Sequence, residues 1–231
     1  MQSATNLDVQ EEPALPCTSL LKDFVGFENV RLSTTYPRGA ILFGEGQPAE
    51  GIYELCSGRA KVCVTSSEGK TVILFIARPG DLLGVNPVLN GVAHEVSVET
   101  LDRCEVDFIS RTDFLKLLDR SKPARSRVCL AIGKELSEVI DRVRSLLLSQ
   151  SSEGKLGRLL LEWCDDFGQL TSQGVRINHG LTQEEIAQMI CASRETVSRL
   201  LTEMKRKEIV EFNGSGIFIR DRGRLELIAK L

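Results

Sequence analysis

The sequence predicts an α+β protein in which an N-terminal β-roll or jelly-roll domain is followed by a long helix and a C-terminal winged helix-turn-helix. Three observations predict this order. Short strand-like runs lie between Thr34 and Ile109, helical periodicity replaces them after Phe114, and two capped helices precede a hairpin signal within residues 181–219. Strands that recur about every 8–12 residues are typical of antiparallel sandwiches, jelly rolls and barrels.

These patterns divide the chain into four segments. We expect a flexible tail at 1–18, the β-roll domain at 19–120, a dimerisation helix at 121–150 and the winged helix-turn-helix domain at 151–231. The tail is polar, contains proline and has no periodicity, and a short helical pattern covers about 19–31.

The composition is that of an ordinary globular protein, with 42% hydrophobic and 26% charged residues among 231. The chain has no apolar run of about 18 residues, and its N-terminus lacks the basic start and apolar core of a secretory signal. We therefore expect a cytoplasmic protein with no membrane partner. Seven cysteines at wide, irregular spacing, without a C-x-x-C pair, argue against a disulfide framework, and we expect no metal site.

The strand-like runs of the first domain are short and are separated by turn signals. The runs are AILF, GIYEL, AKVCV, TVILFIA, HEVSVE and CEVDFI, and the turns between them include GEGQ, SSEGK, ARPGD and LNG. Glycine and proline punctuation of this kind favours tight antiparallel connections.

The dimerisation helix is predicted from a narrow apolar seam. Apolar residues recur at alternating gaps of three and four, which is typical of coiled-coil a and d positions. The seam residues are Cys129, Ile132, Leu136, Val139, Val143 and Leu146. The pattern predicts a parallel homodimer; the alternative is a single amphipathic helix packed on its own domain. SQSSEG at 149–154 is then a hinge, and KLGRLLLEWCDDFG predicts one more helix.

Capping signals define the helix-turn-helix. Thr182 stands three residues before Glu185, which predicts a capping box at the start of the first helix. After Cys191 and Ala192, Ser193 caps a second helix whose buried stripe comprises Val197, Leu200, Leu201 and Met204. IVEFNGSGIFI follows with two β-type runs around Asn-Gly, the signal for a wing hairpin.

The exposed side of the second helix predicts contact with double-stranded DNA. Arg194 and Arg199 match the acceptors of guanine, and Glu195 matches the amino group of cytosine, all in the major groove. Candidate phosphate contacts are Thr182, Thr196, Ser198, Lys205 and Lys207. Residues 193–224 carry eight Lys and Arg against five Asp and Glu, although the whole chain has a net charge of −3. The alternative is a charged helix in a winged module that binds protein.

These residues resemble a known family. SRETVSRLL, preceded by LTQEEIA, resembles the DNA-binding motif of the CRP/FNR (catabolite activator protein) superfamily of bacterial transcription regulators. GRAKV, EGKTVILFIARPGDLLG and CEVDFI resemble the cyclic-nucleotide-binding-like sensor domain of that family. The resemblance implies a homodimer that reads a TGTGA-like palindrome through Arg194, Glu195 and Arg199. Contact with RNA polymerase is compatible with it, although no residue of the sequence establishes that contact.

The resemblance also locates an effector pocket, which looks degenerate. The family's Gly-Glu pair for ribose corresponds to Gly84-Val85, its Arg-Ser or Arg-Thr pair for phosphate to His94-Glu95, and its Thr-Ser pair for adenine to Ile140-Asp141. Val85 cannot accept a ribose hydrogen bond, and no Arg lies between Gly80 and Glu99. Glu95 opposes an anion by roughly 4 kcal/mol at about 4 Å and an intermediate dielectric. We expect no binding of cyclic AMP or cyclic GMP.

The cysteines and histidines are candidates for sensing a signal other than a cyclic nucleotide. An iron-sulfur cluster is discounted because Cys17 is the only cysteine before residue 56. Haem through His94 or through Cys56, Cys63 or Cys104 has no spacing signal and stays open, so we predict no specific cofactor. Cys191 stands where many members of the family have glycine. If its φ is positive it is held at some strain, and we hypothesise that its thiol is a redox switch.

Two other classes of function were weighed against a transcription regulator. One is a cyclic-nucleotide-type sensor module that regulates a partner protein or enzyme, which the helix-turn-helix and wing argue against. The other is an enzyme. The sequence has no P-loop, no G-x-S-x-G and no HExxH motif, and it has only two histidines. We therefore expect that the protein is not an enzyme.

Overall fold

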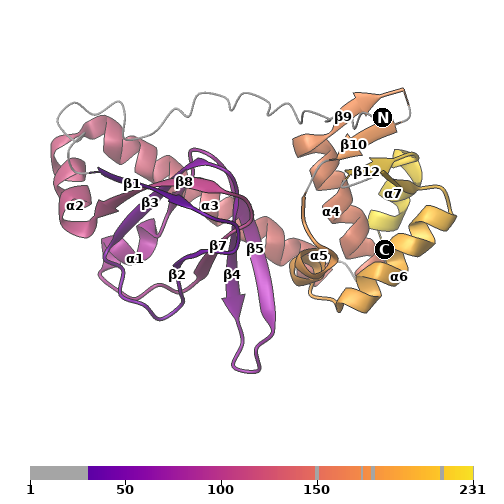
Figure 1. Ribbon diagram of the computed structural model, residues 1–231, viewed down its shortest axis with the longest axis horizontal. Helices are drawn as coiled ribbons and strands as arrows, with labels where there is room; N and C mark the ends of the chain where they lie inside the picture. Colours follow the sequence, from indigo (N-terminus) through magenta and orange to yellow (C-terminus); the bar gives the residue numbers. More distant parts are fainter. Residues whose placement is uncertain (1–30, 149–150, 173, 178–179, 214–215, 231) are drawn as a thin grey trace, which may run out of the picture.

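The computed structural model describes residues 31–148, 151–172, 174–177, 180–213 and 216–230 (Figure 1). A β-roll at one end and a winged helix-turn-helix at the other are connected through a long helix, so the predicted fold class is confirmed (Figure 1). The predicted tail, and all but the last residue of the helical pattern at 19–31, lie outside the described residues. That last residue, Arg31, begins a β-strand instead.

The β-roll consists of two four-stranded antiparallel sheets with the strand orders β1-β8-β3-β6 and β2-β7-β4-β5. The interior between the sheets is apolar and includes Leu55, Val62, Val98 and Val106, each at most 2% exposed. The six predicted runs form strands, whereas β1 and the short β6 were not predicted. The strands are β1 Arg31–Tyr36, β2 Ile41–Phe43, β3 Gly51–Ser57, β4 Ala60–Thr65, β5 Thr71–Ala77, β6 Leu82–Leu83, β7 Ser97–Thr100 and β8 Cys104–Ser110.

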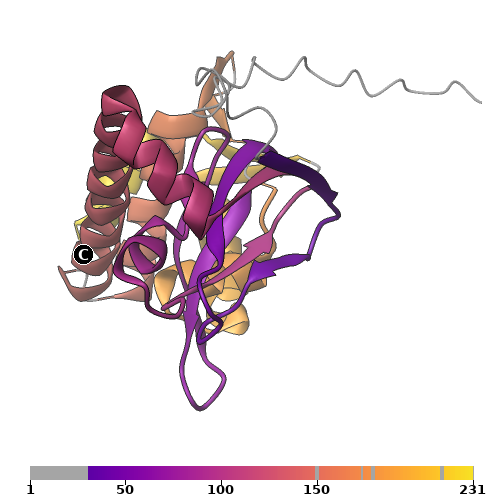
Figure 2. The ribbon, with the colours of Figure 1, turned by 90° about the vertical axis from the view of Figure 1, so that its left-hand side faces the viewer.

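Three helices cover the outer face of the first sheet. They are α1 Val85–Asn90, α2 Arg111–Arg120 and α3 Lys122–Leu148. Ile52 and Ile109 on the sheet form a buried cluster with Phe114 of α2 and Val128 of α3. Figure 2 shows α3 running along one side of the β-roll.

The predicted seam residues on α3 divide between two faces of the helix. Ile132 and Val139 pack against the buried clusters of their own β-roll, and Leu146 is half-buried. A stripe of exposed, mostly apolar residues follows α3 at alternating gaps of four and three, starting at Cys129. This exposed stripe comprises Cys129, Gly133, Leu136, Ile140, Val143 and Leu147.

The division of the seam between two faces has a simple cause. Apolar residues come in adjacent pairs on α3, such as Val139 with Ile140 and Leu146 with Leu147, so a three-and-four pattern can be drawn along two neighbouring faces. One face packs on its own domain, as in the alternative, and the other face stays exposed.

The winged helix-turn-helix domain is built on α4. This helix, Ser152–Phe167, begins inside the predicted linker, because Ser151 caps it by accepting from the amide of Gly154. The sheet of the domain has the order β11-β12-β10-β9, and β9 and β10 were not predicted. Its other elements are β9 Gln169–Thr171, β10 Gly174–Ile177, α5 Gln183–Ile190, α6 Arg194–Arg206, β11 Val210–Asn213, β12 Gly216–Ile219 and α7 Arg222–Ala229.

One buried core joins the two domains. Cys63 of β4 and Ile73 of β5 belong to the same cluster as Leu160 of α4 and Met189 of α5. The β4–β5 hairpin therefore packs against the helix-turn-helix of its own chain. Within the described residues, no helix has the length and apolarity needed to cross a membrane.

Candidate nucleic-acid interface

The start of α5 is fixed by the predicted capping box. The amide of Glu185 donates to the hydroxyl of Thr182 at 3.2 Å, and the amide of Thr182 donates to the Glu185 carboxylate at 2.6 Å. Each side chain thus satisfies a backbone group that the helix itself leaves open. Leu181 and Ile186 are buried on either side, which anchors the helix in the core.

The turn between α5 and α6 has a left-handed residue at its centre. Cys191 has φ 54° and ψ 41°, which confirms the positive φ considered from the sequence. The amide of Ala192 donates to the carbonyl of Ala187 at 3.0 Å and closes the turn. A side chain in this conformation crowds its own backbone, which is why glycine is usual there.

Helix α6 presents the three predicted base contacts together. Ser193 caps it by accepting from the amide of Thr196 at 3.1 Å, and all four residues of the predicted apolar stripe are at most 5% exposed. Arg194, Glu195 and Arg199 are exposed on the opposite side. They line a shallow hollow whose other residues are Gln183, Ser198, Thr202, Glu203 and Arg206.

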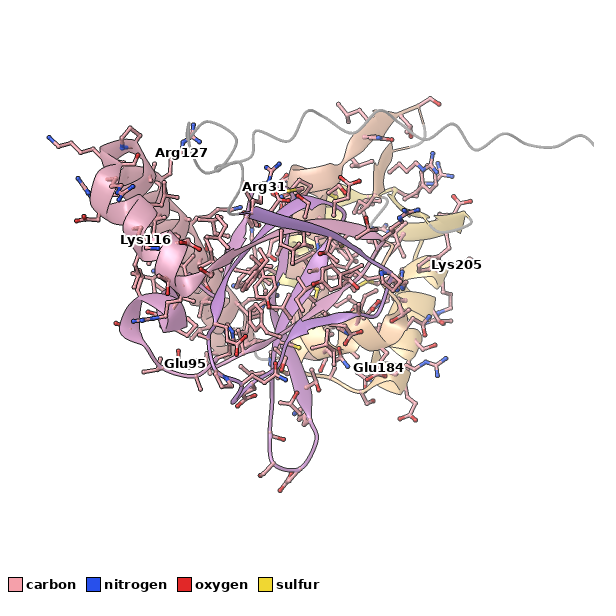
Figure 3. All side chains as sticks on the ribbon, turned by 60° about the vertical axis from the view of Figure 1, so that its left-hand side comes forward. Arg31, Glu95, Lys116, Arg127, Glu184 and Lys205 are labelled. Carbon is pink, nitrogen blue, oxygen red and sulfur yellow. The ribbon has the colours of Figure 1, made fainter. Side chains whose placement is uncertain are left out.

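The predicted phosphate contacts differ in their surroundings. Thr182 is exposed, but its hydroxyl donates to Glu185 at 2.9 Å, and the hydroxyl of Thr196 lies 3.0 Å from that of Ser193. Ser198 is half-buried at the hollow. Lys205 is exposed on the winged-helix domain, at the opposite end of the molecule from Lys116 and Arg127 (Figure 3).

Lys207 is held within the chain by two carboxylates. Its Nζ lies 2.9 Å from Glu203 and 3.7 Å from Glu153. The hydrogen bond to Glu203 raises the pKa of Lys207 and lowers the pKa of Glu203. The positive charge of Lys207 is therefore partly compensated before any phosphate approaches it.

The predicted wing is present as an antiparallel pair. β11 and β12 pair from Val210 opposite Ile219 to Asn213 opposite Gly216, and the tip at 214–215 lies outside the described residues. Arg220 forms an ion pair with Glu211 across the hairpin. The wing thus follows α6 directly, as in other winged helix-turn-helix modules.

The residues predicted to form a degenerate effector pocket include a buried imidazole. His94 is 4% exposed and stacks on Phe43, with ring centroids 3.8 Å apart. Its Cε1 would lie 3.0 Å from a Cβ placed on Gly84, and Val85 is buried beside it. Burial lowers the pKa of His94, so the ring is neutral near pH 7. Nδ1 has no hydrogen-bond partner within the described residues.

The other pocket candidates lie apart from His94. Glu95 is exposed, 3.5 Å from the side-chain amide of Asn86. Ile140 belongs to the exposed stripe of α3, and Asp141 lines a cavity between the two domains instead. The structure thus brings Gly84, Val85 and His94 together but does not join Ile140 and Asp141 to them.

The three cysteines that were candidate haem ligands are buried or hydrogen-bonded within the β-roll. Cys63 and Cys104 are buried, and burial raises the pKa of each thiol. Cys56 donates to the carboxylate of Asp107 at 3.1 Å. No cluster of three or more His, Cys, Asp or Glu among the described residues is arranged to hold a metal ion.

Comparisons with known proteins identify the families that the two parts of the sequence resemble. The model of the cyclic nucleotide-binding domain matches residues 33–121, and that of the Crp-like helix-turn-helix domain matches residues 154–228. The chain is 28% identical over 191 residues to the CRP-like cAMP-activated global transcriptional regulator of Mycobacterium tuberculosis, covering 82% of this chain and 84% of that protein. It is 26% identical over 204 residues to the anaerobic regulatory protein of Bacillus subtilis, covering 87% and 85%.

Solved structures share the fold. A mutant of CooA from Carboxydothermus hydrogenoformans aligns with a TM-score of 0.78 and 21% identity, covering 92% of this chain and 96% of that one. FixK2 from Bradyrhizobium japonicum aligns with a TM-score of 0.73 and 22% identity, covering 86% and 97%.

Proposed function

The chain belongs to the CRP/FNR superfamily of bacterial transcription regulators, and on this basis we propose that it binds a two-fold DNA palindrome as a homodimer. It is a regulator with a helix-turn-helix DNA-binding domain, and its relatives are transcription regulators rather than enzymes. Beyond membership of the family, we propose the oligomeric state, the sequence of the half-site and independence from cyclic AMP. We propose the same four segments as those expected from the sequence, with boundaries after residues 18, 120 and 150. Helix α4 is then the first element of the DNA-binding domain.

The half-site is proposed from the exposed side of α6. Arg194, Glu195 and Arg199 are exposed around one hollow, which is the observation that carries the proposal. Two guanidinium groups suit guanine, and a carboxylate between them suits the amino group of cytosine. Because these residues resemble the base-reading set of the family, the resemblance implies a TGTGA-like half-site, whose complementary strand supplies the cytosines. Lys205 and the hydroxyls of Thr182, Thr196 and Ser198 are proposed to contact phosphates.

The dimer is proposed from the exposed stripe of α3. Leu136, Ile140, Val143 and Leu147 are between 41% and 76% exposed, an unusual state for apolar residues along one helix. Their gaps of four and three match a parallel coiled coil, in which a second copy of α3 would cover them. RNA polymerase remains a proposed partner, with no surface of the chain assigned to it.

Independence from cyclic AMP is proposed from the contents of the pocket. A bound phosphate needs a cation, but His94 is neutral and packed between Phe43 and Gly84, and Glu95 is the next residue. Haem is not proposed, because the ring of His94 is enclosed and Cys56 is already engaged by Asp107. Calorimetry that detects micromolar binding of cyclic AMP or cyclic GMP would overturn this proposal.

Cys191 is proposed to be redox-responsive. Peroxide converts a thiolate to sulfenic acid and releases hydroxide, which places a larger polar group in the turn next to the recognition helix. If so, peroxide should weaken DNA binding of the wild type and leave Cys191→Ser unaffected. Equal sensitivity of the two proteins would exclude this role.

Fluorescence anisotropy with a TGTGA palindrome tests the central proposal. We expect tight binding to the palindrome and much weaker binding to a scrambled duplex of equal length, without added nucleotide. Equal affinity for both duplexes would refute sequence-specific recognition of this half-site. It would favour the second candidate, a sensor module that regulates a partner protein or enzyme.

A further inference from the structure

A cavity of about 500 Å³ lies where β5 and α3 meet α4 and α5 of the DNA-binding domain. In Figure 1, β5 and α5 lie side by side at this junction. The volume falls within the range of about 300–1,000 Å³ that is typical of small-molecule sites. Of the residues predicted for the degenerate effector pocket, Gly84, Val85 and His94 do not line this cavity, whereas Asp141 does. The cavity is therefore distinct from the surroundings of His94.

Arg142 places a buried positive charge in this cavity. It is 8% exposed and lines the cavity from α3. Its Nε donates to the carbonyl of Leu74 on β5 at 3.0 Å. Within the described parts of the chain, its two terminal nitrogens have no hydrogen bond or ion pair. Because a buried charge is costly unless hydrogen bonds and an opposite charge compensate for it, these nitrogens are suited to bind an anion.

Most other charged groups around the cavity already have partners in the chain. The ion pairs are Arg59–Asp102, Arg78–Asp166, Arg144–Asp141, Arg222–Asp165 and Lys134–Glu138. Among the described residues that line the cavity, the charged groups outside such pairs are the guanidinium groups of Arg142 and Arg158 and the carboxylate of Glu162. The guanidinium groups outnumber the carboxylate by one. A ligand with a single negative charge would therefore balance the cavity.

The rest of the cavity wall is apolar. The apolar lining comprises Leu74, Phe75, Ile76, Trp163, Leu181 and Met189. An apolar molecular body gains free energy by leaving water for such a wall, whereas a hydrated inorganic ion does not. The planar guanidinium group matches the two oxygens of a carboxylate. Charge and wall together fit a carboxylate that is carried on an aromatic or aliphatic body.

We propose that this cavity binds a small organic monocarboxylate, with the carboxylate on the terminal nitrogens of Arg142 and the apolar body against Trp163. Such a ligand contacts β5 and α3 on one side and α4 and α5 on the other, so it favours one arrangement of the two domains. It would then act as an effector of DNA binding. This regulatory consequence rests on the function proposed above, whereas the binding site itself does not.

Trp163 is the only tryptophan of the chain, so its fluorescence reports on this cavity. The probe is phenylacetate, added to the full-length protein without DNA and excited where phenylacetate does not absorb. We expect a saturable change in fluorescence with a Kd of about 1 mM or lower. Phenylacetamide has the same shape without the charge and should bind about tenfold more weakly or worse, because it loses the charge-assisted hydrogen bonds. No saturable change with phenylacetate, or equal affinity for the amide, would overturn the proposal.

Inorganic phosphate separates an organic ligand from an anion that binds to the guanidinium group alone. We expect phosphate to bind about tenfold more weakly than phenylacetate or worse, because it leaves the apolar walls without a partner. Equal affinity for both would mean an adventitious ion only, and it would refute the assignment to an organic carboxylate.

Arg142→Leu tests the assigned residue, and Arg120→Leu is the matched control. Arg120 is an exposed arginine at the end of α2 and does not line the cavity. We expect Arg142→Leu to weaken phenylacetate binding about tenfold or more and Arg120→Leu to stay within about twofold of wild type. Unchanged binding by a folded Arg142→Leu would refute the role of Arg142. If circular dichroism shows that Arg142→Leu is unfolded, Arg142→Lys replaces it. Lysine lacks the planar fork, so a loss of about threefold or more is expected, and wild-type affinity would refute the role.

A second experiment tests the regulatory consequence. Fluorescence anisotropy gives the Kd for the TGTGA palindrome with and without saturating phenylacetate. We expect the Kd to change by about threefold or more in the wild type and not in Arg142→Leu. A Kd that does not respond to phenylacetate would refute the effector role, while the fluorescence titration still decides on the site. A protein that does not bind the palindrome at all would refute the proposed DNA recognition and leave the titration result unaffected.

Discussion

Thr182 and Glu185 satisfy each other's backbone amides at the start of α5, at 2.6 and 3.2 Å. Glu185 is also 3.5 Å from Arg38 of the β-roll, so the same carboxylate joins a helix cap to a contact between domains. The first helix of the DNA-binding motif thus contacts the β-roll through a residue that is not among the proposed base contacts.

Thr182→Ala should lower the free energy of unfolding by about 1 kcal/mol, because the amide of Glu185 loses its acceptor. Urea denaturation followed by circular dichroism measures the change. Thr182→Ser keeps the hydroxyl and should remain close to wild type. Similar losses for Ala and Ser would show that the methyl group, and not the cap, supplies the stability.

Arg199→Ala should lower affinity for the cognate palindrome by about 1–3 kcal/mol and relax specificity at one guanine. Lys205→Ala is the matched control, because an exposed lysine that contacts phosphate should weaken binding to all sequences alike and reduce the salt slope by about 1. Lys207 is less suitable, since Glu203 and Glu153 already hold it. Anisotropy titrations on cognate and random duplexes distinguish the two effects, and equal losses for Arg199→Ala on both would contradict base recognition.

The helix-turn-helix could be predicted because its signals are local. Capping residues, a buried stripe and Asn-Gly each specify structure within a few residues. Strands β1, β9 and β10 lack such signals and exist because a partner strand pairs with them. Arg142 has no such local signal either, since an arginine on a helix is usually solvated, and only the tertiary arrangement buries it along the cavity that Glu162 also lines.

Cys191→Gly should raise the free energy of unfolding by about 1 kcal/mol, because glycine adopts a φ of 54° without a side-chain clash. Cys191→Ala is the control, since it removes the thiol and keeps the Cβ that causes the strain. Thermal unfolding of the reduced proteins measures both variants. A stabilisation by Ala as large as that by Gly would assign the effect to the sulfur and not to the backbone.

Stability should fall as the pH is lowered below about 6.5, in part because of His94. Burial lowers the pKa of His94 in the folded state from its usual 6.5, so the unfolded chain binds more protons in the window between the two values. The contribution is complete above the unfolded pKa and is lost progressively below it, until the folded pKa is reached. The contribution of His94 is the difference between the free energies of unfolding of wild type and His94→Phe, each measured in urea. The measurement is repeated from about pH 7.5 downward, over the range in which histidine titrates. A difference that does not change with pH would mean that His94 is not enclosed.

Leu136→Glu should convert the proposed dimer to a monomer and leave the fold intact, because Leu136 is 58% exposed in a single chain and a coiled-coil seam does not accept two facing carboxylates. Val139→Ala is the contrasting variant. Val139 packs against the β-roll of its own chain, so its truncation should lower the melting temperature while the protein stays dimeric. Sedimentation equilibrium and thermal unfolding of both variants give four independent readouts. If Val139→Ala dissociates the dimer and Leu136→Glu does not, the seam runs along the face predicted from the sequence and not along the exposed stripe.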